Sequence, residues 1–427
     1  MCHVNSTVLG IEESRDAVPS CVPSMRRRSA FWLVSGPHCV SELSQAELLA
    51  MNFELVFQML GGGGQTSYAK NSKLQEKAVV RIKPLVEESI KQICKTLPEK
   101  LVVTDLGCSS GPNTLLVLTQ ILNAVYEYCT QSSQLKPEIQ YFLNDLPNND
   151  FNNIFQLSVQ YETRIREEKG DDYVPFYVVG LPGSFYKRLF PSKSVNFFYS
   201  SYSLHWLSQV PKGLEEEGYH LNEKEIYINK GSSTTVANLY LKQFKRDFSD
   251  FLKSRSKELI FGGRMILSFL GRADWQSIGG LLYTWGLIAE ALKAMVLEGL
   301  VEEDKLNAFN LPFYSPSMEE VISVINMEGS FQLEQVQTFD SNWDPFDESN
   351  DTFVEDKRLS GKNVSNYIRS IVEPLITSHF GDEIIEDLFS RYAQNIARHM
   401  SAGKPKYLVF ILFMKLKDEE QAICGGE

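Results

Sequence analysis

The chain has 427 residues, 43% of them hydrophobic, and a formal net charge of −12 at pH 7. This composition provides material for one large core or two smaller ones, and the negative charge excludes a general nucleic-acid binder, which needs a basic face. The seven scattered cysteines form no CxxC pair and no apolar run is long enough for a membrane span, so we expect a cytoplasmic protein without disulfides or a zinc site.

The first fifty residues differ in composition from the rest of the chain. Met25 begins the run MRRRSAFWLV, which is similar to a targeting signal, but its apolar part is short and is interrupted by Gly36 and Pro37. We expect residues 1–50 to be a disordered or extraneous extension, with a plastid-type transit segment as the alternative. One folded domain is expected over residues 51–420.

The strongest strand signal lies in residues 101–113, LVVTDLGCSSGPN. An apolar run leads through Asp105 into a turn with Gly107 and Gly111, and a helical pattern follows over Thr114 to Tyr128. This order is typical of a buried parallel strand that feeds a helix. Glycines let the backbone approach a ligand, and the helix N-terminus offers free N–H groups. We therefore expect a nucleotide-like ligand at the mouth of this strand.

Strand and helix patterns alternate along the chain, which indicates a doubly wound α/β sheet. We predict its core over about 95–272 plus 331–338 and 405–417, the last two as an antiparallel pair, with a helical cap from 273–330 and 341–400. The predicted helices are Lys73 to Cys94, Leu239 to Leu259 and Trp275 to Leu300. The further strands are Glu138 to Leu143, Pro175 to Gly180, Val195 to Ser200, Arg264 to Leu270, Phe331 to Thr338 and Tyr407 to Met414.

The turn after the first strand, GCSSGP, lacks the GxGxxG spacing of a nicotinamide site. Its glycine spacing suits S-adenosylmethionine, which has no pyrophosphate to bind. Asp145, at the end of the second strand, is placed to accept hydrogen bonds from both ribose hydroxyls. The alternative is that Asp105 and Asp145 only cap turns. Two acids at successive strand ends favour a ligand.

A second polar cluster, SYSLHW, follows the fourth strand and contains Tyr202, His205 and Trp206. Aromatic rings with imidazole and indole N–H donors suit an anionic or polar planar substrate. A structural hydrogen bond from His205 and a core position for Tyr202 are the alternatives.

Seven motifs occur in a fixed order between Met51 and Lys417. They are SYAKNS from Ser67, DLGCSSGPN from Asp105, LNDLPNNDFN from Leu143, LPGSFYKRLFP from Leu181, SSYSLHWLSQVP from Ser200, FLGR from Phe269 and AFNLPFYSPS from Ala308. Together they closely resemble the plant SABATH methyltransferases. That family uses S-adenosylmethionine to methylate carboxyl groups of salicylate, benzoate and jasmonate, or ring nitrogens of xanthine alkaloids. The resemblance implies a Rossmann-like class I methyltransferase sheet with a helical cap over the active site.

The resemblance also implies residue roles. The cofactor-binding positions are Tyr68, Cys108, Asn113, Asp145, Leu146, Ser184 and Phe185, with Asp105 in the matching acidic position. Gln75 and Trp206 match the pair that holds the substrate carboxylate, and Tyr202 and His205 line the same pocket. The expected wall of that pocket is formed by Tyr283, Thr284, Trp285, Leu311 and Phe313. A magnesium site reported in some members matches Asn222, Asn307, the Phe309 carbonyl and Asn310.

Three positions depart from the family pattern. Asn307 stands where Asp is usual, the LNEKEIY segment around Asn222 replaces the usual NKG form, and Leu60 replaces Asn or Lys. The missing Asp weakens the case for charge-driven binding of Mg²⁺.

The implied reaction is methyl-ester formation on a small carboxylic acid. A carboxylate is already ionised at neutral pH, so positioning suffices and no catalytic acid or base is expected. The Leu-His-Trp form at His205 favours a jasmonate-like acid ahead of salicylate or benzoate. The alternatives are a xanthine N-methyltransferase and a catalytically silent cofactor-binding relative. No nucleic-acid or membrane partner is expected, and a homodimer is expected by analogy alone.

Overall fold

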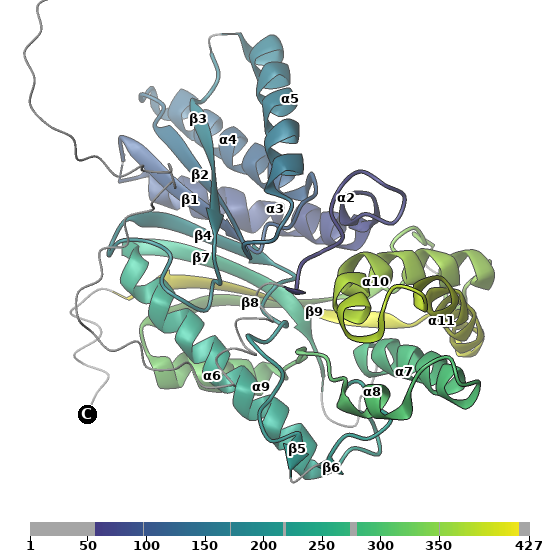
Figure 1. Cartoon of the computed structure of the whole chain (residues 1–427). Coiled ribbons are helices and arrows are strands. Elements are labelled where there is room, and N and C mark those ends of the chain that lie inside the picture. The colour runs from purple at the N-terminus through teal and green to yellow at the C-terminus, as the bar shows by residue number, and fades with distance from the viewer. Residues whose placement is uncertain are drawn as a thin grey trace, which may run out of the picture. The chain divides into compact units, whose positions relative to one another are not determined.

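The computed structural model describes residues 56–417 except 97, 171, 217–218, 274–279 and 350 (Figure 1). The expected extension, residues 1–50, and the first residues of the helix predicted from Trp275 lie outside this range. Among the described residues, no helix is both long enough and apolar enough to cross a membrane.

Seven strands form one sheet in the order β3-β2-β1-β4-β7-β9-β8. Strands β3, β2, β1, β4 and β7 are mutually parallel, and β9 runs antiparallel to both β7 and β8. The expected doubly wound α/β sheet and its final antiparallel pair are therefore confirmed. The strand bounds are β1 Lys100–Leu106, β2 Glu138–Asp145, β3 Phe176–Pro182, β4 Val195–Ser201, β7 Leu259–Gly271, β8 Phe331–Asn342 and β9 Lys406–Leu416, with a separate two-stranded pair of β5 Glu215–Glu216 and β6 Tyr219–His220.

Helices cover both faces of the sheet, and each face has its own core. Neighbouring residues of one strand point to opposite faces: Phe197 packs in the core with α3, α4 and α5, whereas Phe198 packs in the core that contains α6. These central strands read as continuous apolar runs because both faces are buried. The helices of these layers are α3 Lys73–Cys94, α4 Asn113–Ser132, α5 Phe151–Lys169, α6 Thr234–Glu258 and α9 Met318–Glu328.

A helical cap lies beyond the carboxyl ends of the parallel strands (Figure 1). It is built from α7 Leu281–Leu297, α8 Glu303–Ala308, α10 Lys357–Phe380 and α11 Ile385–His399, with the 3₁₀ turn Met400–Ala402 after α11 and the short α2 Tyr68–Asn71 nearby. Helix α9 lies within the range predicted for the cap but is not part of it. It begins with a Ser317–Glu320 capping box and packs against α6 on the face of the sheet.

The boundary between α6 and β7 also differs from the prediction. The sequence pattern predicts a helix up to Leu259 and a strand from Arg264, with a turn at Gly262 and Gly263 between them. In the structure α6 ends at Glu258 and β7 begins at Leu259. The glycine pair lies inside the strand, where the register shifts against β4 and Gly262 has φ +69°.

Candidate functional site

The loop after β1 is shaped by Gly107, which has φ +79°. A Cβ atom at this position would lie 2.1 Å from the Ser203 hydroxyl oxygen, so only glycine fits between the ends of β1 and β4. The backbone N–H groups of Gly107 and Cys108 donate to the Asn144 carbonyl over 2.9 and 3.0 Å. The loop is thereby held against the end of β2, where Asp145 follows.

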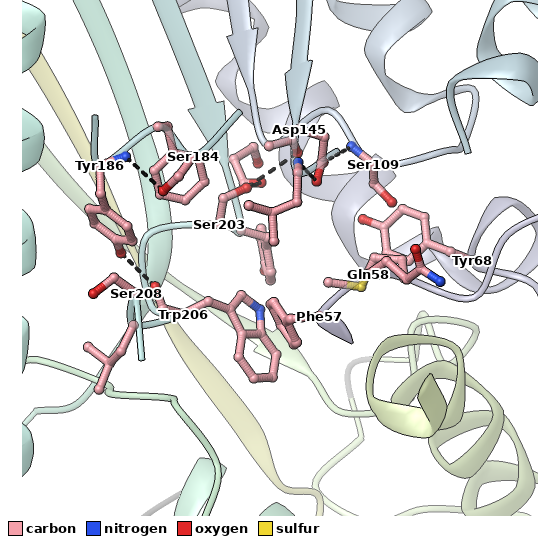
Figure 2. A pocket seen from close by; sticks show the side chains of 17 residues that line it. Phe57, Gln58, Tyr68, Ser109, Asp145, Ser184, Tyr186, Ser203, Trp206 and Ser208 are labelled. Carbon is pink, nitrogen blue, oxygen red and sulfur yellow. Dashed lines mark hydrogen bonds between the residues drawn. The ribbon is translucent and has the colours of Figure 1, made fainter. Parts of the chain in front are cut away.

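Asp145 organises the same loop through its carboxylate (Figure 2). Its two oxygens accept hydrogen bonds from the N–H groups of Ser109, over 2.7 Å, and Leu146, over 2.8 Å. Burial raises the pKa of Asp145 to about 6. Asp105 is also buried, and burial together with the nearby Asp145 charge raises its pKa to about 7, although hydroxyls of Thr114 and Tyr141 act in the opposite direction.

A cavity opens beside this loop at the carboxyl ends of the parallel strands. Five residues predicted to bind the cofactor line it: Tyr68, Asp145, Leu146, Ser184 and Phe185. The two others support its walls. The Cys108 thiol donates to the Ser109 carbonyl, and the Asn113 amide donates to the Ser72 carbonyl over 3.0 Å, which ties α4 to the start of α3.

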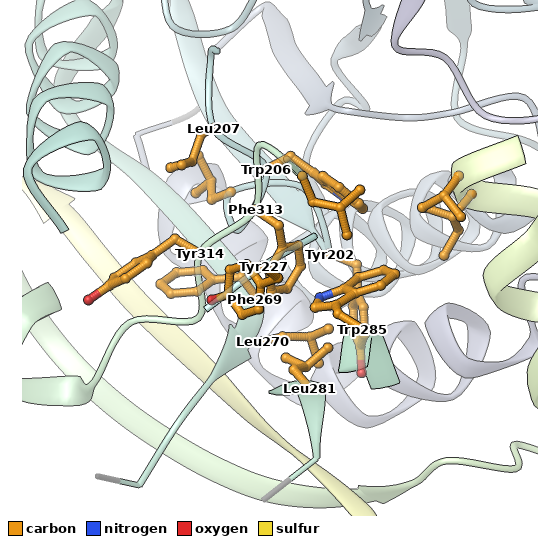
Figure 3. Packing of buried hydrophobic residues seen from close by; sticks show 14 of the residues in the cluster. Tyr202, Trp206, Leu207, Tyr227, Phe269, Leu270, Leu281, Trp285, Phe313 and Tyr314 are labelled. Carbon is orange, nitrogen blue, oxygen red and sulfur yellow. The ribbon is translucent and has the colours of Figure 1, made fainter. Parts of the chain in front are cut away.

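A second, smaller cavity adjoins the first and lies under the helical cap. All four residues predicted to bind the substrate line it: Gln75, Tyr202, His205 and Trp206. Of the predicted wall, Trp285 and Phe313 line the cavity (Figure 3). Thr284 instead donates to the Gly280 carbonyl and lies 3.2 Å from the Tyr407 hydroxyl. The remaining lining residues are Met59, Tyr68, Leu270, Leu281, Tyr367, Ile368 and Ile371.

His205 is a neutral donor in this cavity. Its Nδ1 accepts the backbone N–H of Leu270 over 3.2 Å, so the ring proton is assigned to Nε2. Burial lowers the pKa of His205 to about 3, which keeps the ring neutral at physiological pH. The ring also packs on Phe313, with 5.0 Å between centroids.

The cavity contains further polar atoms that the protein leaves unpaired. Within the described part of the chain, neither the Gln75 side-chain oxygen nor the Trp285 indole nitrogen has a hydrogen-bond partner, although both are buried. Tyr202 has φ +58°, a strained conformation for an aromatic residue, and its N–H is held by the Ser268 carbonyl over 2.8 Å. Buried polar atoms without partners and local strain are both typical of ligand sites.

The residues that match the magnesium site do not fit a cation. The Asn222 amide nitrogen donates to the Asn310 side-chain oxygen over 2.9 Å, and Asn307 accepts the Lys224 backbone N–H over 3.0 Å. The side-chain oxygens therefore already accept hydrogen bonds, and the set has no carboxylate to neutralise a divalent charge. Among the described residues no group of three or more His, Cys, Asp or Glu side chains is arranged to hold a metal.

Nine side chains of the larger cavity received no role from the sequence, and Phe57, Met59, Ser109 and Tyr186 are among them. Phe57 and Met59 come from the segment before α2, and the Phe57 ring centroid lies 4.6 Å from that of Trp206 (Figure 2). Ser109 and Tyr186 stand inside the family motifs but received no role. Phe57 precedes every motif and carried no recognisable signal. Tyr186 follows Ser184 and Phe185 directly, which was an available signal.

Comparisons with known proteins agree with this site. A family model described as SAM dependent carboxyl methyltransferase matches residues 54–417. Anthranilate O-methyltransferase 1 of Zea mays is 42% identical over 375 residues, covering 85% of this chain and 98% of the relative. Probable jasmonic acid carboxyl methyltransferase 2 of Theobroma cacao is 44% identical over 362 residues, covering 84% and 97%.

A solved structure extends the comparison to the fold. Loganic acid methyltransferase with SAH superimposes with a TM-score of 0.72 at 31% sequence identity, covering 85% of this chain and 99% of that one. The sheet order, the cavity at the strand ends and the matched length agree. The chain belongs to the S-adenosylmethionine-dependent carboxyl methyltransferases, the family that its motifs resemble.

Proposed function

We propose that the chain methylates a small carboxylic acid of the jasmonate type. Five aliphatic or thioether side chains line the smaller cavity beside its aromatic rings: Met59, Leu270, Leu281, Ile368 and Ile371. This lining suits an acid with a flexible hydrocarbon part better than a fully planar one. The observation that carries the proposal is His205, whose neutral Nε2–H is available to an oxygen of the acid beyond the carboxylate. A relative 44% identical is named for jasmonic acid, whereas others are named for anthranilate and benzoate.

In the proposed reaction the protein's side chains only orient the acid's carboxylate, which is already reactive. S-adenosylmethionine supplies an electrophilic methyl group on a positively charged sulfur. The acid arrives as a carboxylate at neutral pH, so no side chain has to remove a proton. The Gln75 amide and the Trp206 indole N–H would hold one carboxylate oxygen and leave the other to form the new bond to the methyl carbon as the carbon–sulfur bond breaks. Such positioning can supply about 7–11 kcal/mol of the barrier.

The acceptor is tested with labelled S-adenosylmethionine and a panel of jasmonate, salicylate, benzoate, anthranilate, indole-3-acetate and theobromine. We expect jasmonate to give the highest kcat/KM and a product that mild base hydrolyses, as an ester must. Preference for an aromatic acid would replace the jasmonate proposal and keep carboxyl methylation. A base-stable product from theobromine alone would support the xanthine alternative. Cofactor binding without turnover of any acid would support the silent relative.

Trp206 is tested by its conservative substitution. Trp206→Phe keeps an aromatic ring but removes the indole N–H, a charge-assisted donor worth about 1.5–3 kcal/mol. We expect KM for the acid to rise about tenfold or more while the Kd for S-adenosylhomocysteine stays within about twofold. Trp343→Phe is the matched control, because Trp343 is buried away from both cavities and its indole nitrogen has no partner among the described residues. An unchanged KM in Trp206→Phe would refute the assigned role.

We also propose that this methyl transfer needs no Mg²⁺. Three of the four oxygens implied as ligands by the resemblance, those of the Asn222, Asn307 and Asn310 side chains, accept hydrogen bonds from within the protein. The nearby Glu303 carboxylate is already paired with the Lys224 ammonium over 2.9 Å. A ligand set without a carboxylate gives a divalent cation little compensation for its lost hydration.

A further inference from the structure

Two fully buried charged side chains lie at the carboxyl end of α6. Arg255 donates from Nε to a Glu258 carboxylate oxygen over 2.7 Å, and both side chains have 0% exposure. Moving such a pair out of water costs several kcal/mol for each ion, and apolar residues of similar volume often stabilise a fold equally well. Stability alone therefore does not explain an ion pair at this position.

The other polar atoms of the pair bind one loop, through its main chain and, for Glu258, also through the Arg188 guanidinium, whose Nε lies 3.3 Å from a carboxylate oxygen. The two terminal nitrogens of Arg255 donate to the carbonyls of Phe185, over 2.6 Å, and Lys187, over 2.9 Å. The second carboxylate oxygen of Glu258 accepts the N–H groups of Leu189, over 2.6 Å, and Phe190, over 3.0 Å. The pair thus makes four hydrogen bonds to the main chain of residues 185–190, which follow β3.

This loop forms one wall of the larger cavity. Ser184, Phe185 and Tyr186 line the cavity, and the carbonyls held by Arg255 lie on either side of Tyr186. The Tyr186 hydroxyl in turn donates to the Trp206 carbonyl over 2.5 Å (Figure 2). The position of the loop therefore fixes the cavity wall and also contacts the segment that carries Trp206.

We propose that Arg255 and Glu258 are positioning residues for the cofactor, because they hold residues 185–190 in the conformation that presents Ser184 and Phe185 to S-adenosylmethionine. The inference rests on the cofactor occupying the larger cavity. The planar guanidinium is suited to this task, since its rigid fork can bind one carboxylate and two carbonyls at fixed positions. An apolar pair would fill the same volume and fix neither carbonyl.

Arg255→Lys is the direct test. Lysine keeps the positive charge beside Glu258 but cannot span both carbonyls. We expect the Kd for S-adenosylhomocysteine, measured by calorimetry, to rise about tenfold or more, whereas the acid's KM at saturating cofactor changes less than about twofold. A folded Arg255→Lys protein that binds S-adenosylhomocysteine as tightly as the wild type would overturn the proposal.

Arg264→Lys is the matched control. Arg264 also pairs with a carboxylate, that of Glu334, and its guanidinium lies 5.2 Å from the Phe413 ring centroid, much as that of Arg255 lies 5.1 Å from the Phe198 ring. It joins β7 to β8 and lines neither cavity. We expect its cofactor affinity to equal that of the wild type. An equal loss of affinity in Arg264→Lys would show a general effect of arginine removal and would overturn the proposal.

Glu258→Gln keeps the inference testable where Arg255→Lys fails to fold. Glutamine retains an oxygen for the N–H groups of Leu189 and Phe190 but loses the charge that orients Arg255. We expect the variant to unfold in a cooperative transition, which shows that it is folded. We expect its Kd for S-adenosylhomocysteine to be raised about fivefold or more. Loss of folding in both variants would mark the pair as purely structural and would overturn the proposal, as would an unchanged Kd.

Binding of S-adenosylhomocysteine does not depend on which acid is methylated. A wild-type protein that binds it but methylates no acid of the panel refutes the acceptor proposal and leaves the positioning role to be decided by the variants. A wild-type protein that does not bind it refutes the cofactor assignment and the positioning role together.

Discussion

Asp105 holds its proton more tightly in the folded protein than in the unfolded chain. Burial raises its pKa from the ordinary value of 3.8 to about 7. The folded state therefore retains a proton, between those pH values, that the unfolded chain has released. The contribution of Asp105 to stability is thus highest below about pH 4 and is lost as the pH rises towards 7.

Asp105→Asn removes this dependence, because an amide does not titrate. We expect the variant's free energy of unfolding, relative to that of the wild type, to increase from pH 4.5 to pH 7.5 by up to about 3 kcal/mol in the absence of cofactor. Urea unfolding of both proteins at several pH values measures the difference. Asp382→Asn is the control, because Asp382 is exposed. Parallel pH profiles for Asp105→Asn and the wild type would contradict the prediction.

At the scale of elements, an asparagine cluster joins two loops near the cap. The side chains of Asn222 and Asn310 form a hydrogen bond with each other. Next to them, the Leu311 carbonyl accepts the Tyr240 hydroxyl over 3.1 Å, and the Leu311 N–H donates to the Ile226 carbonyl over 2.8 Å. Phe313, two residues beyond Leu311, lines the smaller cavity. Hydrogen bonds between neutral groups thus hold the cavity wall in the place where a cation would have to bind.

We therefore expect turnover to be insensitive to metal removal. Assays after dialysis against EDTA, with and without added Mg²⁺, should give the same kcat and KM, since the residues that match the magnesium site include no carboxylate. Asn310→Ala should lower the melting temperature in both conditions equally, because it breaks the contact with Asn222. Activity that is lost in EDTA and restored by Mg²⁺ would contradict this expectation.

For the whole molecule, the sequence predicted the sheet well because both of its faces are buried. Apolar runs such as the one before Asp105 are typical of central strands in an α/β fold. The glycines and acids that follow these runs predicted that the ligand site lies at the carboxyl ends of the strands. The motifs added residue roles, and the structure gathers Gln75, Tyr202, His205 and Trp206 around one cavity. The positions of Phe57 and α9 depend on contacts between distant segments, which local patterns do not encode.

The buried pair of α6 was missed for a related reason. Arg255 and Glu258 stand in a charged stretch, KSRSKE, that reads as a solvated helix end. Only the loop that folds over it, about 70 residues earlier in the chain, buries both charges. Sequence spacing cannot reveal a partner at that separation.

The two cavities share four side chains, Met59, Tyr68, Tyr202 and Trp206, and this common wall has a thermodynamic consequence. A ligand that binds in one cavity and orders these side chains lowers the entropic cost of binding in the other cavity. Each ligand should therefore raise the protein's affinity for the other ligand. The coupling free energy must be the same in both directions.

Calorimetric titration of S-adenosylhomocysteine with and without the acid, and of the acid with and without S-adenosylhomocysteine, should therefore give the same ratio of dissociation constants. A ratio of one in both titrations would show that the shared wall is already rigid. If the dissociation constant without the other ligand exceeds that with it, fresh acid strengthens the binding of the spent cofactor, which must then leave a tighter complex before the next turnover.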